Sequence, residues 1–176
     1  MSKSTKAIAL MLVLAFTLSV FVSGALAGPK GPTIVDVAIA VNSDGPFAGQ
    51  FDTLIAAVLA ADPAVLNTLS GNGQFTVFAP TDAAFAALGL TPDNIGTLPQ
   101  AFLTDVLLYH VAHGSRYAED VVDSKRIRTL NKSFLLQDGG VLTDNLGREA
   151  TIIVTDVPAA NGVIHAIDAV VLPYAP

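Results

Sequence analysis

The sequence predicts an α+β domain whose helices come first and whose largely antiparallel sheet comes second. Up to about residue 112, apolar residues recur at the spacing of a helix face and follow capping residues. From Arg126 onward, apolar and polar residues alternate, as in strands that bury one face. Because helical and extended segments are segregated along the chain, an α+β architecture fits better than alternating βαβ units.

Residues 1–27 have the pattern of a cleavable signal peptide. Lys3 and Lys6 precede an uncharged apolar run over residues 7–22, and Ala25-Leu26-Ala27 is a small-x-small cleavage site. A single-pass membrane anchor is the alternative, but the run is short for a bilayer and ends in a cleavage pattern. We therefore expect export to the periplasm, the cell surface or the medium. The predicted parts are a signal peptide (1–27), a flexible lead-in (28–32) and one domain (33–173).

The charge balance is acidic, which narrows the classes of partner. The chain has a formal net charge of −6; without residues 1–27 it holds 7 basic and 15 acidic residues, a net charge of −8. Nucleic acids and anionic lipid headgroups are bound through basic surfaces, so we expect no nucleic-acid partner and no charge-driven binding to lipid headgroups. No second apolar run of membrane length follows, so we expect no membrane insertion after signal removal. There is no cysteine, so a hydrophobic core alone must hold what we expect to be a monomer.

Capping residues mark the helices of the first half. Thr33 and Asp36 resemble a capping box at the start of a short helix. Asp52 is placed to cap the next helix, and Asp62-Pro63 caps and begins its continuation. A longer helix is expected from Pro99 to about Ala112, with Leu103, Val106, Leu107 and His110 on one face.

A strand is predicted at Phe75 to Phe78, between the early helices and the longer one. Phe75 and Val77 point to one face of this strand, and Thr76 and Phe78 point to the other. The strand is expected to stop near Pro80, which has no N–H to donate to a sheet.

A short helix should follow this strand without a loop. Thr81 or Asp82 can cap it, and an acid in this first turn stabilises a helix by about 1 kcal/mol. Phe85 then returns an aromatic ring to the apolar side. We interpret this corner as an organiser of the fold and not as a reaction site.

The second half reads as strands joined by turns. Asp138-Gly139-Gly140 and Asn161-Gly162 are hairpin turn signals. The predicted strands are Arg126 to Leu130, Phe134 to Gln137, Val141 to Thr143, Ala150 to Val157 and Val163 to Leu172.

Three stretches resemble signatures of the fasciclin domain family. Phe75-Thr-Val-Phe-Ala-Pro-Thr-Asp-Ala-Ala-Phe85 resembles the first signature, and Asn161 to Pro173 resembles the second. Leu107-Leu-Tyr-His-Val111 resembles the Tyr-His motif between them. Their order and spacing also fit, and the resemblance covers nearly the whole of the predicted domain.

The resemblance implies a β-wedge or sandwich of mainly antiparallel strands with the N-terminal helices packed on it. Fasciclin domains are extracellular or periplasmic modules of adhesion and matrix proteins and are not known as a catalytic family. Their motif residues then have structural roles, which here fall on Phe78, Pro80, Thr81, Asp82, Phe85, Asn161, Gly162, His165 and Asp168.

The resemblance also points to one partner-binding position. In animal members the Tyr-His neighbourhood has been linked to integrin binding, which here falls on Tyr109 and His110. The sequence departs from the family pattern at Lys132, where glycine is usual, and at His113, where proline is common.

The three histidines are the candidates for a metal or catalytic site. His110 and His113 have a spacing that can share a metal on a helix, but no metalloprotease spacing accompanies them. His110 and His165 are better explained as buried groups with polar partners, for which Asp82 and Asp168 are the nearest candidates. A His–Asp pair can orient a general base, but no Cys and no Gly-x-Ser-x-Gly supplies a nucleophile. We therefore expect no catalytic residue, no metal and no cofactor.

Basic residues cluster at Lys125, Arg126, Arg128 and Lys132. A solvated strand edge protected against sheet-to-sheet association is the simpler explanation. Contact with an acidic polysaccharide or another partner is the alternative.

These observations favour an exported, non-catalytic fasciclin-like module that mediates cell adhesion or cell-surface and matrix interaction. Its expected partner is a protein or polysaccharide at the cell surface or in the matrix. The alternatives are a carrier of a small ligand or polysaccharide, and a hydrolase that uses His and Asp groups.

Overall fold

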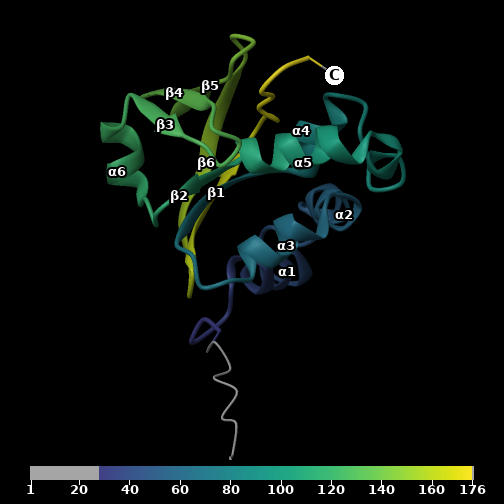
Figure 1. Cartoon of the computed structure of the whole chain (residues 1–176), viewed down its shortest axis with the longest axis horizontal. Helices are drawn as coiled ribbons and strands as arrows, with labels where there is room; N and C mark the ends of the chain where they lie inside the picture. The colour runs from purple at the N-terminus through teal and green to yellow at the C-terminus, as the bar shows by residue number, and fades with distance from the viewer. Residues whose placement is uncertain (1–27, 176) are drawn as a thin grey trace, which may run out of the picture.

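The computed structural model describes residues 28–175, and the predicted signal peptide lies outside the described residues. The helices are α1 (Ile34–Ser43), α2 (Asp52–Ala60), α3 (Pro63–Leu69), α4 (Asp82–Ala86), the 3₁₀ helix η1 (Ile95–Thr97), α5 (Gln100–Tyr109) and α6 (Ala118–Asp123). The strands are β1 (Phe75–Pro80), β2 (Val111–His113), β3 (Arg126–Arg128), β4 (Phe134–Asp138), β5 (Val141–Thr143), β6 (Glu149–Ala159) and β7 (Gly162–Ile167). The α+β prediction is confirmed, with α1 to α5 on one side of the sheet and α6 on the other (Figure 1).

The strands form one seven-stranded sheet in the order β2-β1-β7-β6-β5-β4-β3. Within residues 28–175, every neighbouring pair is antiparallel except β1 and β7, which run parallel. An isolated bridge joins Ala112 in β2 to Thr129 just after β3, so the two ends of the sheet meet. The sheet thus curls back on itself, in keeping with the predicted wedge.

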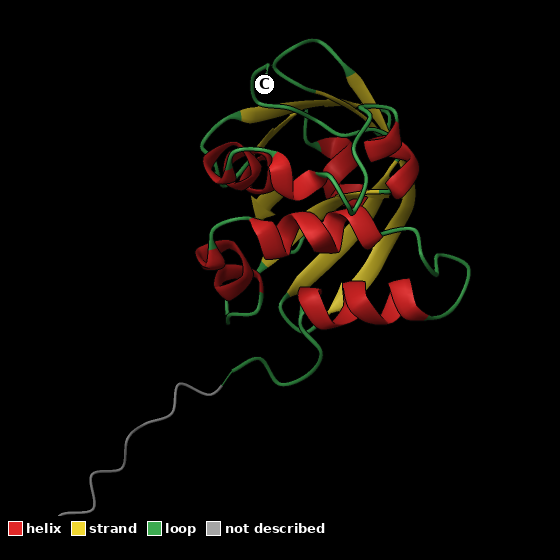
Figure 2. Ribbon diagram, turned by 90° about the vertical axis from the view of Figure 1, so that its right-hand side faces the viewer, coloured by secondary structure: helices red, strands yellow, loops and turns green. Residues whose placement is uncertain are grey.

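The curled sheet separates two hydrophobic clusters. The helix-side core lies between the sheet and helices α1 to α5, which stand in front of the strands in Figure 2, and it contains Phe75 and Val77. The sheet-interior core lies inside the curl; it contains Phe78 and one buried side chain from each other strand. The predicted alternation of β1 is confirmed, because its two faces feed the two clusters.

Two of the predicted helix starts are confirmed and one is wrong. Thr33 and Asp36 form a capping box at α1, and the Asp62 side chain accepts from the Ala64 N–H at 2.8 Å. Asp52 does not cap α2: it lies inside the first turn, and its carboxylate accepts instead from the side chain of Asn42 at 2.7 Å.

The predicted helix at Pro99 is shorter than expected. It ends at Tyr109, and residues 111–113 form strand β2, which pairs with β1. Apolar spacing continues through this segment, but the backbone groups of β1 need partners along that edge and β2 supplies them. His113 is consequently an exposed strand residue, packed against the ring of Phe75 at 5.8 Å, and shares no helix face with His110.

Two further elements differ from the prediction. The sequence predicts no helix at α6, which is short and contributes one buried residue, Val121. The last strand ends at Ile167 and not at Leu172. Asp168 ends it: its carboxylate accepts from the Thr151 N–H at 2.6 Å, and the chain then turns.

Lys132 stands at a left-handed backbone position, with a φ of 71°. Glycine adopts this conformation at no steric cost, whereas a side chain is strained there. The departure from the family pattern therefore falls on a turn that glycine would suit.

Within residues 28–175, no single helix is both long and apolar enough to cross a bilayer. Helices α2 and α3 reach that length and composition only as a pair, and this pair is bent by 119°.

Candidate functional site

The side chain of Tyr109 is buried at the end of α5, with 0% of its surface exposed. Its hydroxyl donates to the carbonyl of Phe134 at 2.9 Å and accepts from the N–H of Asn145 at 3.2 Å. Burial raises the pKa of Tyr109 to about 12. The hydroxyl thus links α5 to strand β4 and to the turn that follows β5.

His110 is also buried, with 3% of its surface exposed. Its Nδ1 lies 2.8 Å from the carbonyl of Val106, and its Nε2 accepts from the N–H of Val171 at 3.2 Å. These partners define the neutral tautomer with the proton on Nδ1. Burial lowers the pKa of His110 to about 4.

The family resemblance assigned partner binding to Tyr109 and His110. Since both side chains are interior, neither is offered to a partner on the surface of this structure. Their positions support a structural role.

His165 occupies the middle of β7 and is fully buried. Its Nδ1 accepts from the N–H of Asp156 at 3.2 Å, and its Nε2 lies 2.8 Å from the carbonyl of Arg116. The ring stacks on Phe78 with centroids 5.8 Å apart. The expectation of a buried, satisfied histidine is confirmed for both His110 and His165.

The expected aspartate partners of these histidines are wrong. Asp82 accepts from the N–H of Thr53 at 2.9 Å, and so caps α2 from a different helix. Asp168 binds the backbone of Thr151. The helix of Asp82 is capped by Thr81, whose hydroxyl accepts from the Ala84 N–H at 3.4 Å. The corner after β1 therefore starts two helices at once.

Asn161 does more than form a hairpin turn. Its side chain is fully buried, and its Oδ1 accepts from the N–H of Ile34 at 2.8 Å. Its Nδ2 donates to the carbonyls of Leu69 and Gly71 at 2.7 and 2.9 Å. One amide thus joins the start of α1, the end of α3 and the start of β7.

The next residue, Gly162, is required by close approach. A Cβ at this position would collide with the carbonyl oxygen of Phe75 and with the side chain of Ile34. Nothing larger than glycine fits between β1 and α1 here.

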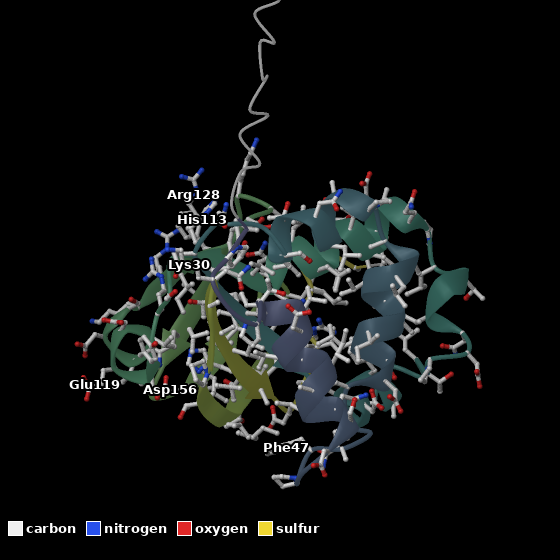
Figure 3. All side chains as sticks on the ribbon, turned by 90° about the horizontal axis from the view of Figure 1, so that it is seen from below. Lys30, Phe47, His113, Glu119, Arg128 and Asp156 are labelled. Atoms are coloured by element: carbon white, nitrogen blue, oxygen red, sulfur yellow. The ribbon has the colours of Figure 1, made fainter. Side chains whose placement is uncertain are left out.

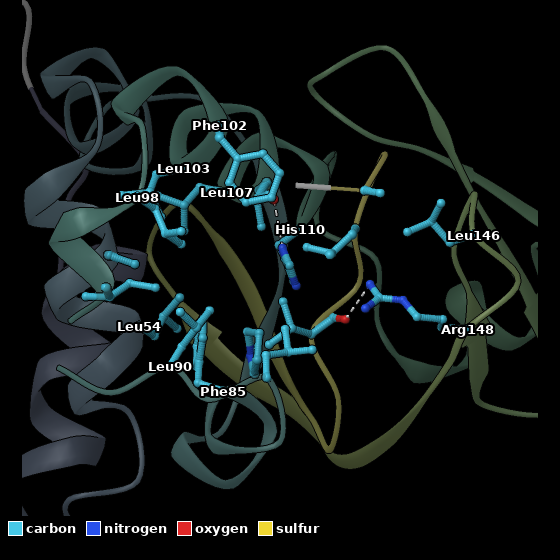
Figure 4. A pocket seen from close by; sticks show the side chains of 18 residues that line it. Leu54, Phe85, Leu90, Leu98, Phe102, Leu103, Leu107, His110, Leu146 and Arg148 are labelled. Carbon is cyan, nitrogen blue, oxygen red and sulfur yellow. Dashed lines mark hydrogen bonds between the residues drawn. The ribbon is translucent and has the colours of Figure 1, made fainter.

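An apolar pocket of about 280 Å³ lies among α2, α4, α5 and the C-terminal segment (Figure 4). Its walls are aliphatic and aromatic except for His110 and Arg148. His110 turns both nitrogens to the backbone, so Arg148 is the cation at this pocket. The segments that line the pocket are far apart in the sequence, so no local sequence motif predicts it.

Arg148 is held by a network around Asp144. Its guanidinium contacts the carboxylate of Asp144 at 2.7 and 2.9 Å and the carbonyl of Val170 at 3.1 Å. Burial opposes ionisation of Asp144, but hydrogen bonds from Leu172, Arg148 and Leu146 outweigh it and lower its pKa. Among the described residues this is the one salt bridge.

A second apolar groove, of about 240 Å³, lies beside α1, α2 and α3. Ile39 and Leu59 stand at this groove with 47% and 71% of their surfaces exposed.

A basic hollow of about 470 Å³ lies where the two ends of the sheet meet. The register of the Ala112–Thr129 bridge sets His113 opposite Arg128. Lys30, His113 and Arg128 stand on one side of the molecule in Figure 3, away from Glu119 and Asp156. The hollow is lined by His113, Arg116, Arg128, Thr129, Leu130 and Lys132.

The described residues contain no group of three or more His, Cys, Asp or Glu placed to hold a metal ion. The candidate binding features described above are apolar recesses and a basic surface.

Comparison with known proteins settles the family. Residues 49–173 match the model of the Fasciclin domain. The chain belongs to the fasciclin domain family. It is 41% identical over 145 residues to Protein sll1483 of Synechocystis sp., and this match covers 80% of this chain and 73% of that protein. It is 33% identical over 161 residues to Immunogenic protein MPB70 of Mycobacterium bovis, covering 86% of this chain and 79% of that one.

A solved structure confirms the fold. The FAS1 domain pair of the insect cell adhesion molecule Fasciclin I matches with a TM-score of 0.55 and 22% sequence identity. The match covers 72% of this chain and 47% of that chain, so this fasciclin domain spans about half of the solved pair.

Proposed function

We propose that this fasciclin domain is an exported module that mediates adhesion at the cell surface or in the matrix by non-catalytic binding. The observation that carries the proposal is that the polar side chains of the family signatures are buried and hydrogen-bonded. Tyr109, His110 and His165 are buried, and their polar atoms are engaged by backbone groups. Side chains that could serve acid–base chemistry are thus used to hold the fold.

Two further observations support the proposal. The family includes Fasciclin I, which is described as a cell adhesion molecule. Export is supported by the signal-peptide pattern of residues 1–27.

The direct test compares surface attachment of source cells that carry the protein, lack it, or lack it and express it again from a plasmid. We expect attachment to fall on deletion and to return on re-expression. Equal attachment of all three strains would contradict the adhesion role.

A second candidate function is the binding of a small apolar ligand. The observation that favours it is the apolar pocket beside α5. Its aliphatic and aromatic walls suit an apolar ligand, and Arg148 at its edge is already paired with Asp144.

The fluorescent probe 1-anilinonaphthalene-8-sulfonate tests this candidate. Leu88, 41% exposed at the pocket, is changed to Trp to fill the entrance, and the control is Leu59→Trp in the separate groove. Loss of probe binding in Leu88→Trp alone supports the candidate. Equal binding by both variants contradicts it.

A further inference from the structure

We propose that the basic face at the junction of β2 and β3 binds a linear acidic polysaccharide. The basic face is defined by His113, Arg116, Lys125, Arg126, Arg128 and Lys132. The proposal rests on the proposed function, because it names the class of partner for the same binding role.

The first argument is the concentration of basic side chains in an acidic chain. Residues 28–175 hold seven Lys or Arg against 15 Asp or Glu, and five of the seven lie between Arg116 and Lys132. Like charges repel at short range, so crowding them on one face destabilises the free protein. An anionic partner removes that repulsion.

The second argument is that these cations are free of carboxylates. In the part of the chain that the structure describes, the salt bridge joins Arg148 to Asp144, and neither belongs to the basic face. Arg116 donates to the hydroxyl of Ser124 at 3.2 Å and to the carbonyl of His113 at 3.4 Å, both neutral groups. Arg126 lies over the ring of Phe134, 4.2 Å from its centre.

The third argument is geometric. Ile127 is fully buried, so Arg126 and Arg128 on either side of it point outward together. His113 faces Arg128 across the bridge, and Lys132 follows in the adjoining turn. The result is a strip of donors along the sheet, and the forked guanidinium groups suit carboxylates and sulfates.

Edge protection accounts for less of this pattern than the sequence suggested. The end of β3 is not left open, because the N–H of Leu130 donates to the carbonyl of Val111 at 2.8 Å and Thr129 bridges to Ala112. A partly closed edge has less need of basic residues to prevent association.

Acidic groups of α6 lie beyond the Lys125 end of the strip, which favours a single polymer chain over a broad surface. Helix α6, which comes just before Lys125 and Arg126 along the chain, carries exposed Glu119, Asp120 and Asp123. A flat anionic membrane or a wide nucleic-acid duplex approaching the strip also meets these carboxylates. A thin polysaccharide can follow the cations and pass α6 by.

The test measures binding of the full chain by calorimetry to dextran sulfate and to polygalacturonate, with uncharged dextran as a blank. The test variant is Arg128→Gln/Lys132→Gln. The control, Ala64→Glu/Ala101→Glu, makes the same net-charge change at exposed first-turn positions of α3 and α5. We expect the test variant to bind about tenfold more weakly than the wild type, the control to bind like the wild type, and affinity to fall as salt rises.

Absence of binding to both acidic polymers overturns the inference, as does equal weakening by the control. Tighter binding to short duplex DNA or to phosphatidylglycerol vesicles also overturns it, by assigning the face to another class of partner. Attachment of cells carrying Arg128→Gln/Lys132→Gln separates the two proposals. If deletion abolishes attachment but this variant attaches normally, the adhesion role stands and the polysaccharide face fails.

Discussion

The second family signature and the basic face use polar groups in opposite ways. In the second signature, Asn161 and His165 are fully buried, and each polar atom of their side chains meets a backbone group. On the basic face, Arg128 and Lys132 are exposed, and no carboxylate within the described residues pairs with them. A satisfied buried group stabilises one fold, whereas an exposed unpaired cation remains available to a partner.

This difference teaches where to look for function in a fasciclin domain. The residues that match the family signatures stabilise this fold, because their polar atoms bind backbone groups inside it. Surface residues, such as those of the basic face, remain available to bind a partner, and the fold does not determine which partner that is. The predictions below separate these two kinds of residue.

The largest effect is expected for Asn161→Ala. This change leaves the Ile34 N–H and the Leu69 and Gly71 carbonyls without their buried partner. We expect the free energy of unfolding to fall by about 3–5 kcal/mol, measured by urea denaturation. The control is Asn67→Ala on the exposed side of α3, which should change stability by less than about 0.5 kcal/mol. Equal stability of the two variants would remove the structural role of Asn161.

The second effect is a loss of stability in acid through His110. Burial lowers its folded pKa from 6.5 to about 4, with Arg148 and Asp144 nearby. The unfolded chain therefore binds more protons in this window. The contribution of neutral His110 is complete above pH 6.5 and is lost as the pH falls toward 4. The loss is up to about 3 kcal/mol.

Unfolding titrations of the wild type and His110→Gln from pH 7 to 4 isolate this contribution. The wild type should lose more stability than His110→Gln across the window. His113→Gln, on the exposed end of β2, serves as the control and should follow the wild type. Parallel curves for wild type and His110→Gln would contradict the buried neutral imidazole.

The third effect tests the cap that crosses between helices. Asp82→Ala should lower stability by about 1 kcal/mol, because the Thr53 N–H at the start of α2 loses its acceptor. Asp82→Asn keeps an oxygen acceptor and should cost less. Asp52→Ala, at the start of the same helix, removes an exposed hydrogen bond from Asn42 but no capping contact, and should cost less than Asp82→Ala in thermal melts. A larger loss in Asp52→Ala than in Asp82→Ala would reverse the assignment.

The smallest effect joins stability and binding in one residue. Lys132→Gly should raise the free energy of unfolding by about 0.5 kcal/mol, because its φ of 71° suits glycine. The same change removes a cation and should weaken binding to dextran sulfate. Thermal melts and calorimetry on one preparation measure both. A variant that gains stability and keeps full affinity would show that Lys132 takes no part in binding.

Much of the fold was accessible from sequence because its signals are local. The capping box at Thr33, the Asp62-Pro63 start and the alternation of β1 each depend on neighbouring residues. The parallel pairing of β1 with β7 and the cap from Asp82 to Thr53 depend on contacts between distant segments. Local pattern carries no information on such pairings.

The features of the candidate site also divide into those that the local sequence predicts and those that depend on contacts between distant segments. The burial of His110 and His165 followed from their apolar surroundings, but their partners are backbone groups, and sequence alone suggested aspartates. The C-terminal segment supplies part of the wall of the apolar pocket and contacts α5, where the Tyr174 hydroxyl donates to Asp105 at 2.8 Å. The basic cluster was visible in the sequence, but its freedom from carboxylates appears only in the fold.

The central claim is that binding resides on the basic face and not on the Tyr-His motif. The most direct measurement compares the affinities of Tyr109→Phe and Arg128→Gln/Lys132→Gln for dextran sulfate at one salt concentration. The account predicts that Tyr109→Phe melts at a lower temperature but binds like the wild type, because its hydroxyl serves Phe134 and Asn145. The double variant should melt like the wild type and bind about tenfold more weakly. Weakened binding in Tyr109→Phe with full affinity in the double variant would contradict the claim.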